Sequence, residues 1–170
     1  MFNFIKAFFI GLFTSAESTL TIPAITNFDE NKFIDTWYEY VRYDHWFEKD
    51  LTNVFTEYVK TPSGDIQVLN NGTKNNKTVV IAGKAKLKYP DKPNVGELKV
   101  SFFGPFYSDY RIIWADEQFE TIIVTGKTKD YFWILSKNPT LSSLDFVKVI
   151  NAAMSFGFEV NKMIINEKFN

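Results

Sequence analysis

From about residue 36 onward, the chain consists of short segments rich in β-branched and aromatic residues, separated by turn signals. Alternation is clearest where Leu98, Val100 and Phe102 are interleaved with polar residues. Ala85 and Leu87 alternate with lysines in the same way. Because successive side chains of a strand point to opposite faces, this pattern indicates strands with one apolar and one solvated face. We expect eight strands, at residues 36–43, 53–60, 66–69, 77–88, 96–103, 110–115, 119–125 and 131–136.

The connections between these segments are short. Asn70-Asn71-Gly72 predicts a tight reversal near Gly72, because Asn and Gly tolerate a positive φ. Regular spacing predicts a sandwich or a barrel, and the up-and-down order of neighbouring hairpins favours the barrel, which closes its own edges. The predicted fold class is therefore all-β with one C-terminal helix, built as an eight-stranded antiparallel up-and-down β-barrel.

After Pro139 the hydrophobic period changes to that of a helix. Apolar residues recur at helical spacing between Ser142 and Phe158, namely Leu144, Val147, Ile150, Met154 and Phe158. A last, weakly alternating strand is expected at about 160–166. Barrels of eight strands are either filled by side chains or hold one small ligand. Alternation alone leaves both possibilities open.

Charge and residue types exclude several functions. Lys and Arg number 19 against 20 Asp and Glu, and they form no basic stripe, so we predict no nucleic-acid partner. There is no Cys, which excludes disulfides, thiolate catalysis and Cys-based zinc sites. A single histidine, His45, excludes a multi-His metal site. We predict no metal and no cofactor.

The first residues resemble an export signal. Lys6 precedes a short apolar run at 7–13, and small residues follow at 14–16. The run is shorter than the ~20 residues of a membrane span. We therefore predict a signal peptide at 1–16, cleaved after Ala16, and a single barrel domain at 17–170. The alternative is an amphipathic helix that stays on the protein and covers one end of the barrel.

Several short sequence motifs, in this order and spacing, closely resemble those of the bacterial lipocalins related to apolipoprotein D. The resemblance covers about residues 27–165. The most specific are LKVSFFGPFY at 98–107 and YFWILSK at 131–137 followed by Pro139; the others are Asn27-Phe28-Asp29, Thr36-Trp37-Tyr38-Glu39, Gly83-Lys84-Ala85 and Gly157-Phe158. This resemblance implies a barrel with an open mouth, a closed base and an external helix. It also implies binding of fatty acids, lysophospholipids or similar amphiphiles. Bacterial members are usually outer-membrane lipoproteins linked to envelope maintenance.

The chain departs from the family pattern in three places. Asp35 replaces the glycine that usually opens the first strand. Lys137 replaces the Arg that lies across the first-strand Trp, so a cation–π contact with Trp37 is expected without planar stacking. The lipid-accepting Cys is absent, which predicts an exported protein that is not lipid-anchored.

Strand alternation and the resemblance together predict the ligand contacts. Trp37 points inward as a structural plug at the base together with Lys137, and alternation puts Glu39 and Val41 inward above it. Tyr58, Asn70 and Trp133 match inward or pocket positions of the family. The predicted ligand-binding residues are Glu39, Thr56, Tyr58, Asn70, Val100, Phe102, Tyr107, Tyr131, Trp133 and Leu135. Val54 shares the face of Thr56 and Tyr58.

Two points stay open. A carboxylate inside a barrel is costly unless it is hydrogen-bonded or neutral, so Glu39 binds either a ligand head group or a satisfied internal network. The facing of Tyr110, Ile112 and Trp114 is not determined by the pattern.

Two other functional classes compete with ligand binding. An enzyme would need a nucleophile with its base, and Asp44-His45 with a distant Ser has no supporting motif. We therefore predict no catalytic residues and interpret His45 as a residue that anchors a loop. A filled barrel could instead act as an interaction protein, with the 103–107 turn and Trp46-Phe47 forming an apolar patch for a partner or for peripheral membrane contact. A homodimer is also compatible with the sequence.

Overall fold

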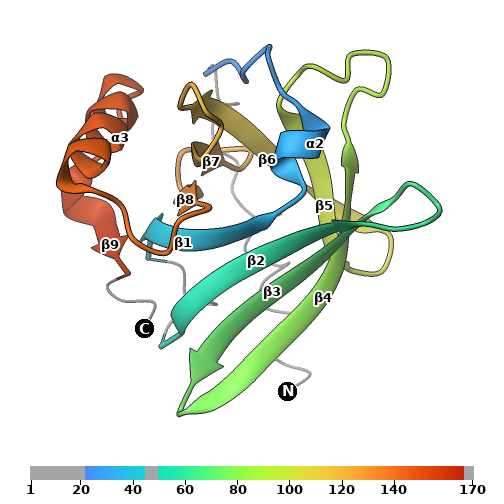
Figure 1. The fold of residues 1–170 in the computed structure, drawn as a ribbon, viewed down its shortest axis with the longest axis horizontal. Coiled ribbons are helices and arrows are strands. Elements are labelled where there is room, and N and C mark those ends of the chain that lie inside the picture. Colours follow the sequence, from blue (N-terminus) through green and yellow to red (C-terminus); the bar gives the residue numbers. More distant parts are fainter. Residues whose placement is uncertain (1–21, 45–49, 167–170) are drawn as a thin grey trace.

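The protein folds as a closed antiparallel barrel with a helix packed on its outside (Figure 1). A computed structural model describes residues 22–44 and 50–166, and within them the sheet has the strand order β2-β3-β4-β5-β6-β7-β8-β1-β9. The strands are β1 (Thr36–Tyr43), β2 (Thr52–Lys60), β3 (Ile66–Lys74), β4 (Lys77–Leu87), β5 (Glu97–Phe103), β6 (Phe106–Ala115), β7 (Thr121–Thr125), β8 (Phe132–Ser136) and β9 (Met163–Ile165). The predicted fold class is confirmed. The signal peptide at 1–16, His45 and Trp46-Phe47 lie outside the described residues.

Strand β1 closes the barrel because it pairs with strands on both of its sides. Trp37 lies opposite Thr56 of β2, and Glu39 lies opposite Leu135 of β8. Both pairings are antiparallel, and the far end of β1 also pairs with the short strand β9. The backbone donors and acceptors along this seam are therefore satisfied within the sheet, and no open edge is left there.

A β-bulge between Glu39 and Val41 changes which side chains of β1 face inward. The register with β8 shifts at this point, so that Val41 lies opposite Ile134 and Arg42 lies opposite Trp133. Val41 therefore packs in the cluster between the barrel and the external helix. The expectation that Val41 points inward was wrong, because one extra residue inverts the alternation.

The hairpin between β3 and β4 turns later than predicted. Strand β3 continues through Gly72, which lies opposite Val79, and ends at Lys74. The reversal occurs at Asn75 and Asn76, whose φ angles of 51° and 58° suit the two-residue turns of twisted hairpins. The predicted reversal near Gly72 was therefore wrong, since a second Asn pair downstream adopts the left-handed conformation instead.

The C-terminal helix α3 (Ser143–Ser155) begins at the predicted position. Its N-cap is Ser142, whose hydroxyl accepts a hydrogen bond from the Asp145 backbone N–H at 3.1 Å. Val149 and Ala153 are fully buried against the barrel, whereas Leu144 on the stripe used to predict the helix is 78% exposed. Val147 and Met154 of the same stripe are also exposed, whereas Phe146 and Ile150 pack with the buried pair, so both faces of the helix carry apolar residues. None of the helices in the described part of the chain has the length and apolarity needed to cross a membrane.

One end of the barrel is closed by an aromatic layer. The short helix α2 (Glu30–Phe33) places the Phe33 ring 6.2 Å from that of Trp37, whose indole N–H donates to the Phe33 carbonyl at 2.9 Å. Phe119 contacts Trp37 edge-on at 6.0 Å. Lys137 Nζ lies 5.3 Å from the Trp37 ring centroid and 3.5 Å from an Asp35 carboxylate oxygen. Large, buried rings therefore close this end of the barrel.

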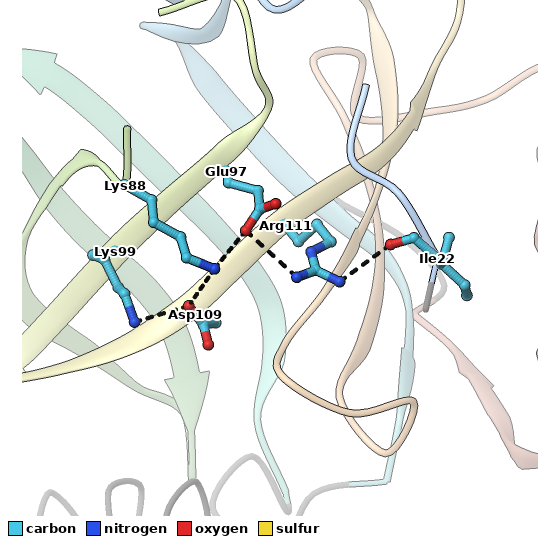
Figure 2. Close-up of polar contacts among 6 residues, drawn as sticks. All are labelled: Ile22, Lys88, Glu97, Lys99, Asp109 and Arg111. Atoms are coloured by element: carbon cyan, nitrogen blue, oxygen red, sulfur yellow. Dashed lines mark hydrogen bonds and ion pairs between the residues drawn. The ribbon is translucent and has the colours of Figure 1, made fainter. Parts of the chain in front are cut away.

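Opposite charges form a network on the outer face of β5 and β6 (Figure 2). Glu97 accepts from Lys88 at 2.6 Å and lies 3.4 Å from Arg111, while Asp109 lies 2.9 Å from Lys99 and 3.4 Å from Lys88. Burial alone would raise the pKa of Asp109, but the hydrogen bond and charge of Lys99, together with Lys88, hold it below its ordinary value. These ion pairs link side chains of β5 to side chains of β6.

The N-terminal segment crosses these strands and is hydrogen-bonded to them. Ile25 donates its N–H to the Ile112 carbonyl and accepts from the Gly96 N–H, each at 2.9 Å. Arg111 holds the start of the segment by donating to the Ile22 carbonyl at 3.1 Å (Figure 2). A Cβ at Gly96 would lie 2.7 Å from Ile25 Cγ1 and 3.2 Å from the Ile112 oxygen, so only glycine permits this approach.

We predict that Gly96→Ala lowers the free energy of unfolding by about 1–3 kcal/mol, because the added methyl group displaces the N-terminal segment. Urea denaturation measures the change. Gly72→Ala is the matched control, since its Cβ would meet ordinary contacts of 3.4 Å or more and should change stability little. Equal effects of the two substitutions would contradict this role of Gly96.

We also predict that Asp109→Asn lowers stability by about 0.5–1 kcal/mol at neutral pH. Because the folded pKa is depressed, this contribution is present above the ordinary value of 3.8 and is lost as the pH falls through the folded pKa. Urea denaturation at neutral and at acidic pH should therefore show that the difference in unfolding free energy between Asp109→Asn and wild type is smaller in acid. The control is Asp91→Asn, which changes an exposed carboxylate and should alter stability little at neutral pH. A difference for Asp109→Asn that stays constant between the two pH values would refute the prediction.

Candidate ligand cavity

A cavity lies inside the barrel above the aromatic base. Its volume is about 90 Å³, several times the ~10–15 Å³ that a single water needs, so side chains do not fill the interior completely. The residues that line it come from β1, β2, β3, β5, β6, β7 and β8, with Gly126 following β7: Glu39, Val54, Thr56, Tyr58, Asn70, Val100, Phe102, Ser108, Asp109, Tyr110, Val124, Gly126, Trp133 and Leu135.

Eight of the ten residues predicted to contact a ligand lie in this lining. They are Glu39, Thr56, Tyr58, Asn70, Val100, Phe102, Trp133 and Leu135. The structure therefore brings together residues that are almost 100 positions apart in the sequence. Their contact with a ligand stays a prediction.

The structure places Tyr107 on the outer face of the barrel rather than at the cavity. Its ring lies 4.4 Å from Lys86 Nζ and 5.7 Å from Lys84 Nζ, and both lysines are exposed on β4. The turn between β5 and β6 contains only Gly104 and Pro105, so Tyr107 already belongs to β6. Alternation along β6 then directs it to the same side as the ion-pair network.

Tyr131 also lies outside the lining. Its ring stacks on Trp133, with 6.3 Å between centroids and 20° between planes. It borders a separate surface hollow, beside Lys129, Asp130 and Lys162. Tyr131 therefore supports the Trp133 side chain from behind instead of facing the cavity.

Phe102 lies against β4 because Gly83 leaves room for its ring. A Cβ at Gly83 would be 2.5 Å from Phe102 Cδ1 and 2.6 Å from the Ser101 carbonyl oxygen. The ring consequently forms part of the cavity wall at a position where a larger residue would displace it.

Glu39 belongs to an internal network that the sequence pattern did not reveal. Arg42 donates through Nη1 to Glu39 Oε1 at 2.9 Å, and both side chains are only 5% exposed. Asn166 completes the network: its amide donates to Glu39 Oε1 at 2.7 Å and to the Glu39 carbonyl at 3.3 Å, and its Oδ1 accepts from Arg42 at 2.9 Å. Arg42 faces inward because of the bulge in β1, which a sequence cannot show.

Burial raises the pKa of Glu39 above its ordinary value, and the charge and hydrogen bond of Arg42 and the amide of Asn166 oppose this shift. The pair brings one charge of each sign to the interior. A charged ligand group that entered here would meet a cation that is already neutralised.

Hydroxyl and amide groups supply further polarity. Thr56 donates to Asn70 Oδ1 at 2.7 Å, linking β2 and β3. Tyr58 donates to the Tyr110 hydroxyl at 3.1 Å across the barrel. Burial raises the pKa of both tyrosines, so both hydroxyls stay protonated at neutral pH.

Sequence reasoning missed Ser108, Asp109, Val124 and Gly126 and left Tyr110 undecided. The signal for Ser108 and Tyr110 was present, because alternation from a strand that starts at Phe106 directs both inward. A second register shift between Ile112 and Trp114 then sends Trp114 to the outer cluster. The described residues contain no group of three or more His, Asp or Glu that could hold a metal ion.

Comparison with known proteins identifies the family. The model of the lipocalin-like domain matches residues 28–168, which is most of the chain. The chain belongs to the lipocalin family. Lipocalins typically bind small hydrophobic ligands and are generally binding proteins rather than enzymes.

Individual relatives agree with this assignment. The lipocalin is 36% identical over 158 residues to the outer membrane lipoprotein Blc of Citrobacter freundii. This alignment covers 93% of this chain and 89% of the relative. It is 30% identical over 179 residues to apolipoprotein D of Macaca fascicularis, covering 94% and 91%. Its fold is similar to that of insecticyanin from the tobacco hornworm, Manduca sexta, with a TM-score of 0.74 at 19% identity over 91% of this chain and 88% of that chain.

We predict that Glu39→Gln lowers the free energy of unfolding by about 3–5 kcal/mol, because it leaves the buried Arg42 without a counter-charge. The double variant, Glu39→Gln with Arg42→Met, should lose less free energy of unfolding than the single variant Glu39→Gln. Urea denaturation of the two single variants and the double variant gives the coupling between them. Additive effects would show that the two side chains do not stabilise each other.

Proposed function

We propose that this lipocalin binds one small hydrophobic or amphipathic molecule, of the fatty acid or lysophospholipid class, in the cavity above Trp37. The observation that carries the proposal is a cavity enclosed by a barrel whose other end is filled with aromatic rings. Valines and rings such as Phe102 and Trp133 suit an acyl chain, and the hydroxyl and amide groups between them suit polar atoms.

The filled-barrel alternative is less well supported, because the interior keeps room for several waters. The enzyme alternative depended on His45, which lies outside the described residues. The relatives named Blc are described as outer membrane lipoproteins, which favours export and a role in envelope lipid maintenance. Peripheral membrane contact is part of the same proposal, supported by Phe103 and Phe106, which are 43% and 53% exposed beside one turn. A homodimer stays a prediction.

We predict saturable binding of a long-chain fatty acid or a lysophospholipid with a stoichiometry near one. Trp133→Ala should weaken it about tenfold, because the indole forms part of the cavity wall. Isothermal titration calorimetry measures the affinity, and circular dichroism checks that the variant is folded. Tyr107→Ala is the matched control, since this aromatic side chain lies on the outer face and its loss should leave the affinity unchanged.

Absence of saturable binding by the folded protein would favour the filled barrel. Sustained hydrolysis of an ester that is abolished by His45→Ala would favour the enzyme. Mass spectrometry of molecules that copurify with the native protein would identify the ligand directly.

A further inference from the structure

Two tyrosines meet across the barrel at the inner end of the cavity. Tyr58 belongs to β2 and Tyr110 to β6, strands that are not neighbours in the sheet, yet their hydroxyl oxygens are 3.1 Å apart. Both rings rest on Phe33 of the aromatic base, with centroid distances of 4.3 and 6.1 Å. A molecule that reaches the base of the cavity therefore meets these two hydroxyl groups as well as apolar side chains.

The two hydroxyls leave one donor unused. Two tyrosines carry two O–H groups, and one hydrogen bond between them uses one of these groups. The remaining O–H can donate to an oxygen placed above the pair. Because burial raises the pKa of both tyrosines, this donor persists at neutral pH.

Ser108 adds a second polar group on the same wall. It lies two residues before Tyr110 on β6 and therefore points to the same side, and both residues line the cavity. Its buried Oγ has no hydrogen-bond partner among the described residues. A buried hydroxyl without a partner is unfavourable, and a ligand oxygen at this level would satisfy it.

The charges around the cavity disfavour an ionised group at this depth. Arg42 is already paired with Glu39, and Asp109 with Lys99 and Lys88. A carboxylate or phosphate brought down to the tyrosines would lose its hydration without gaining a free counter-ion. The polar groups of the inner end therefore match a neutral oxygen.

We propose that Tyr110 and Ser108, with Tyr58 holding Tyr110 in place, form a subsite for a neutral hydroxyl or carbonyl oxygen at the buried end of the ligand. This inference rests on the proposed function and narrows the ligand class. The preferred ligand is then an acyl chain that is oxygenated near its buried end, with any charged group nearer the mouth.

The test compares ω-hydroxy fatty acids of medium to long chain length with the fatty acids in which a methyl group replaces the terminal hydroxyl. Each pair has the same shape and the same carboxylate, so a difference in affinity reports the buried oxygen. Titration calorimetry on the full chain should show that, at the chain length that reaches the tyrosines, the hydroxy acid binds about threefold to tenfold more tightly.

Tyr110→Phe and Ser108→Ala should each reduce this preference, measured as the ratio of the two affinities within the same variant. Tyr107→Phe, which removes a hydroxyl from the outer face of the same strand, should leave both affinities as they are. If Tyr110→Phe disturbs folding, Ser108→Ala is a small enough change to test the subsite by itself.

The outcomes separate this inference from the proposed function. Saturable binding of both ligand series without any preference at any length overturns the subsite and leaves the proposed function intact, as expected if ordered water satisfies these hydroxyls. A preference that survives both substitutions also overturns the subsite. Failure of both series to bind overturns the subsite and the proposed function together.

Discussion

The barrel depends on β1, the strand that hydrogen-bonds to β2 on one side and to β8 on the other. Without both pairings the sheet would be open, and its two edges would expose unpaired backbone groups. The same strand carries Trp37 into the aromatic base and Glu39 into the cavity, while its far end packs Val41 and Tyr43 against α3 and the C-terminal segment. Closure, base, cavity and external helix therefore all involve this one strand.

The bulge in β1 determines the electrostatics of the interior. A regular strand would have directed Arg42 outward and left the buried Glu39 carboxylate without its counter-charge. With one extra residue in the strand, Arg42 lies inside, and Asn166 covers the Glu39 carbonyl at the irregularity. The interior therefore contains a paired charge, which is less costly than an isolated one and which leaves little net attraction for an ionised ligand group.

Side-chain size explains why one end of the barrel is filled and the rest is hollow. At the base, Phe28, Phe33, Trp37 and Phe119 pack ring against ring within 6.2 Å. Higher up, the rings of Phe102 and Trp133 share the lining with the shorter side chains of Val54, Thr56, Asn70 and Val124, which leave space between them. A barrel of this strand number lies near the limit at which side chains fill the interior, so a modest reduction in size opens a cavity.

The sequence by itself determined the order of the strands and the C-terminal helix, because alternation and turn residues are local signals. It also determined most of the cavity wall, because the motifs shared with the family place Tyr58, Asn70 and Trp133. It did not determine the facing of Val41, Arg42 and Trp114, because a register shift inverts the alternation and depends on pairing with a distant strand. Nor did it place Tyr107, since the exact start of β6 follows from pairing with β5. The hydrogen bond between Tyr58 and Tyr110 joins residues on opposite sides of the barrel, and only closure of the sheet brings their hydroxyls together.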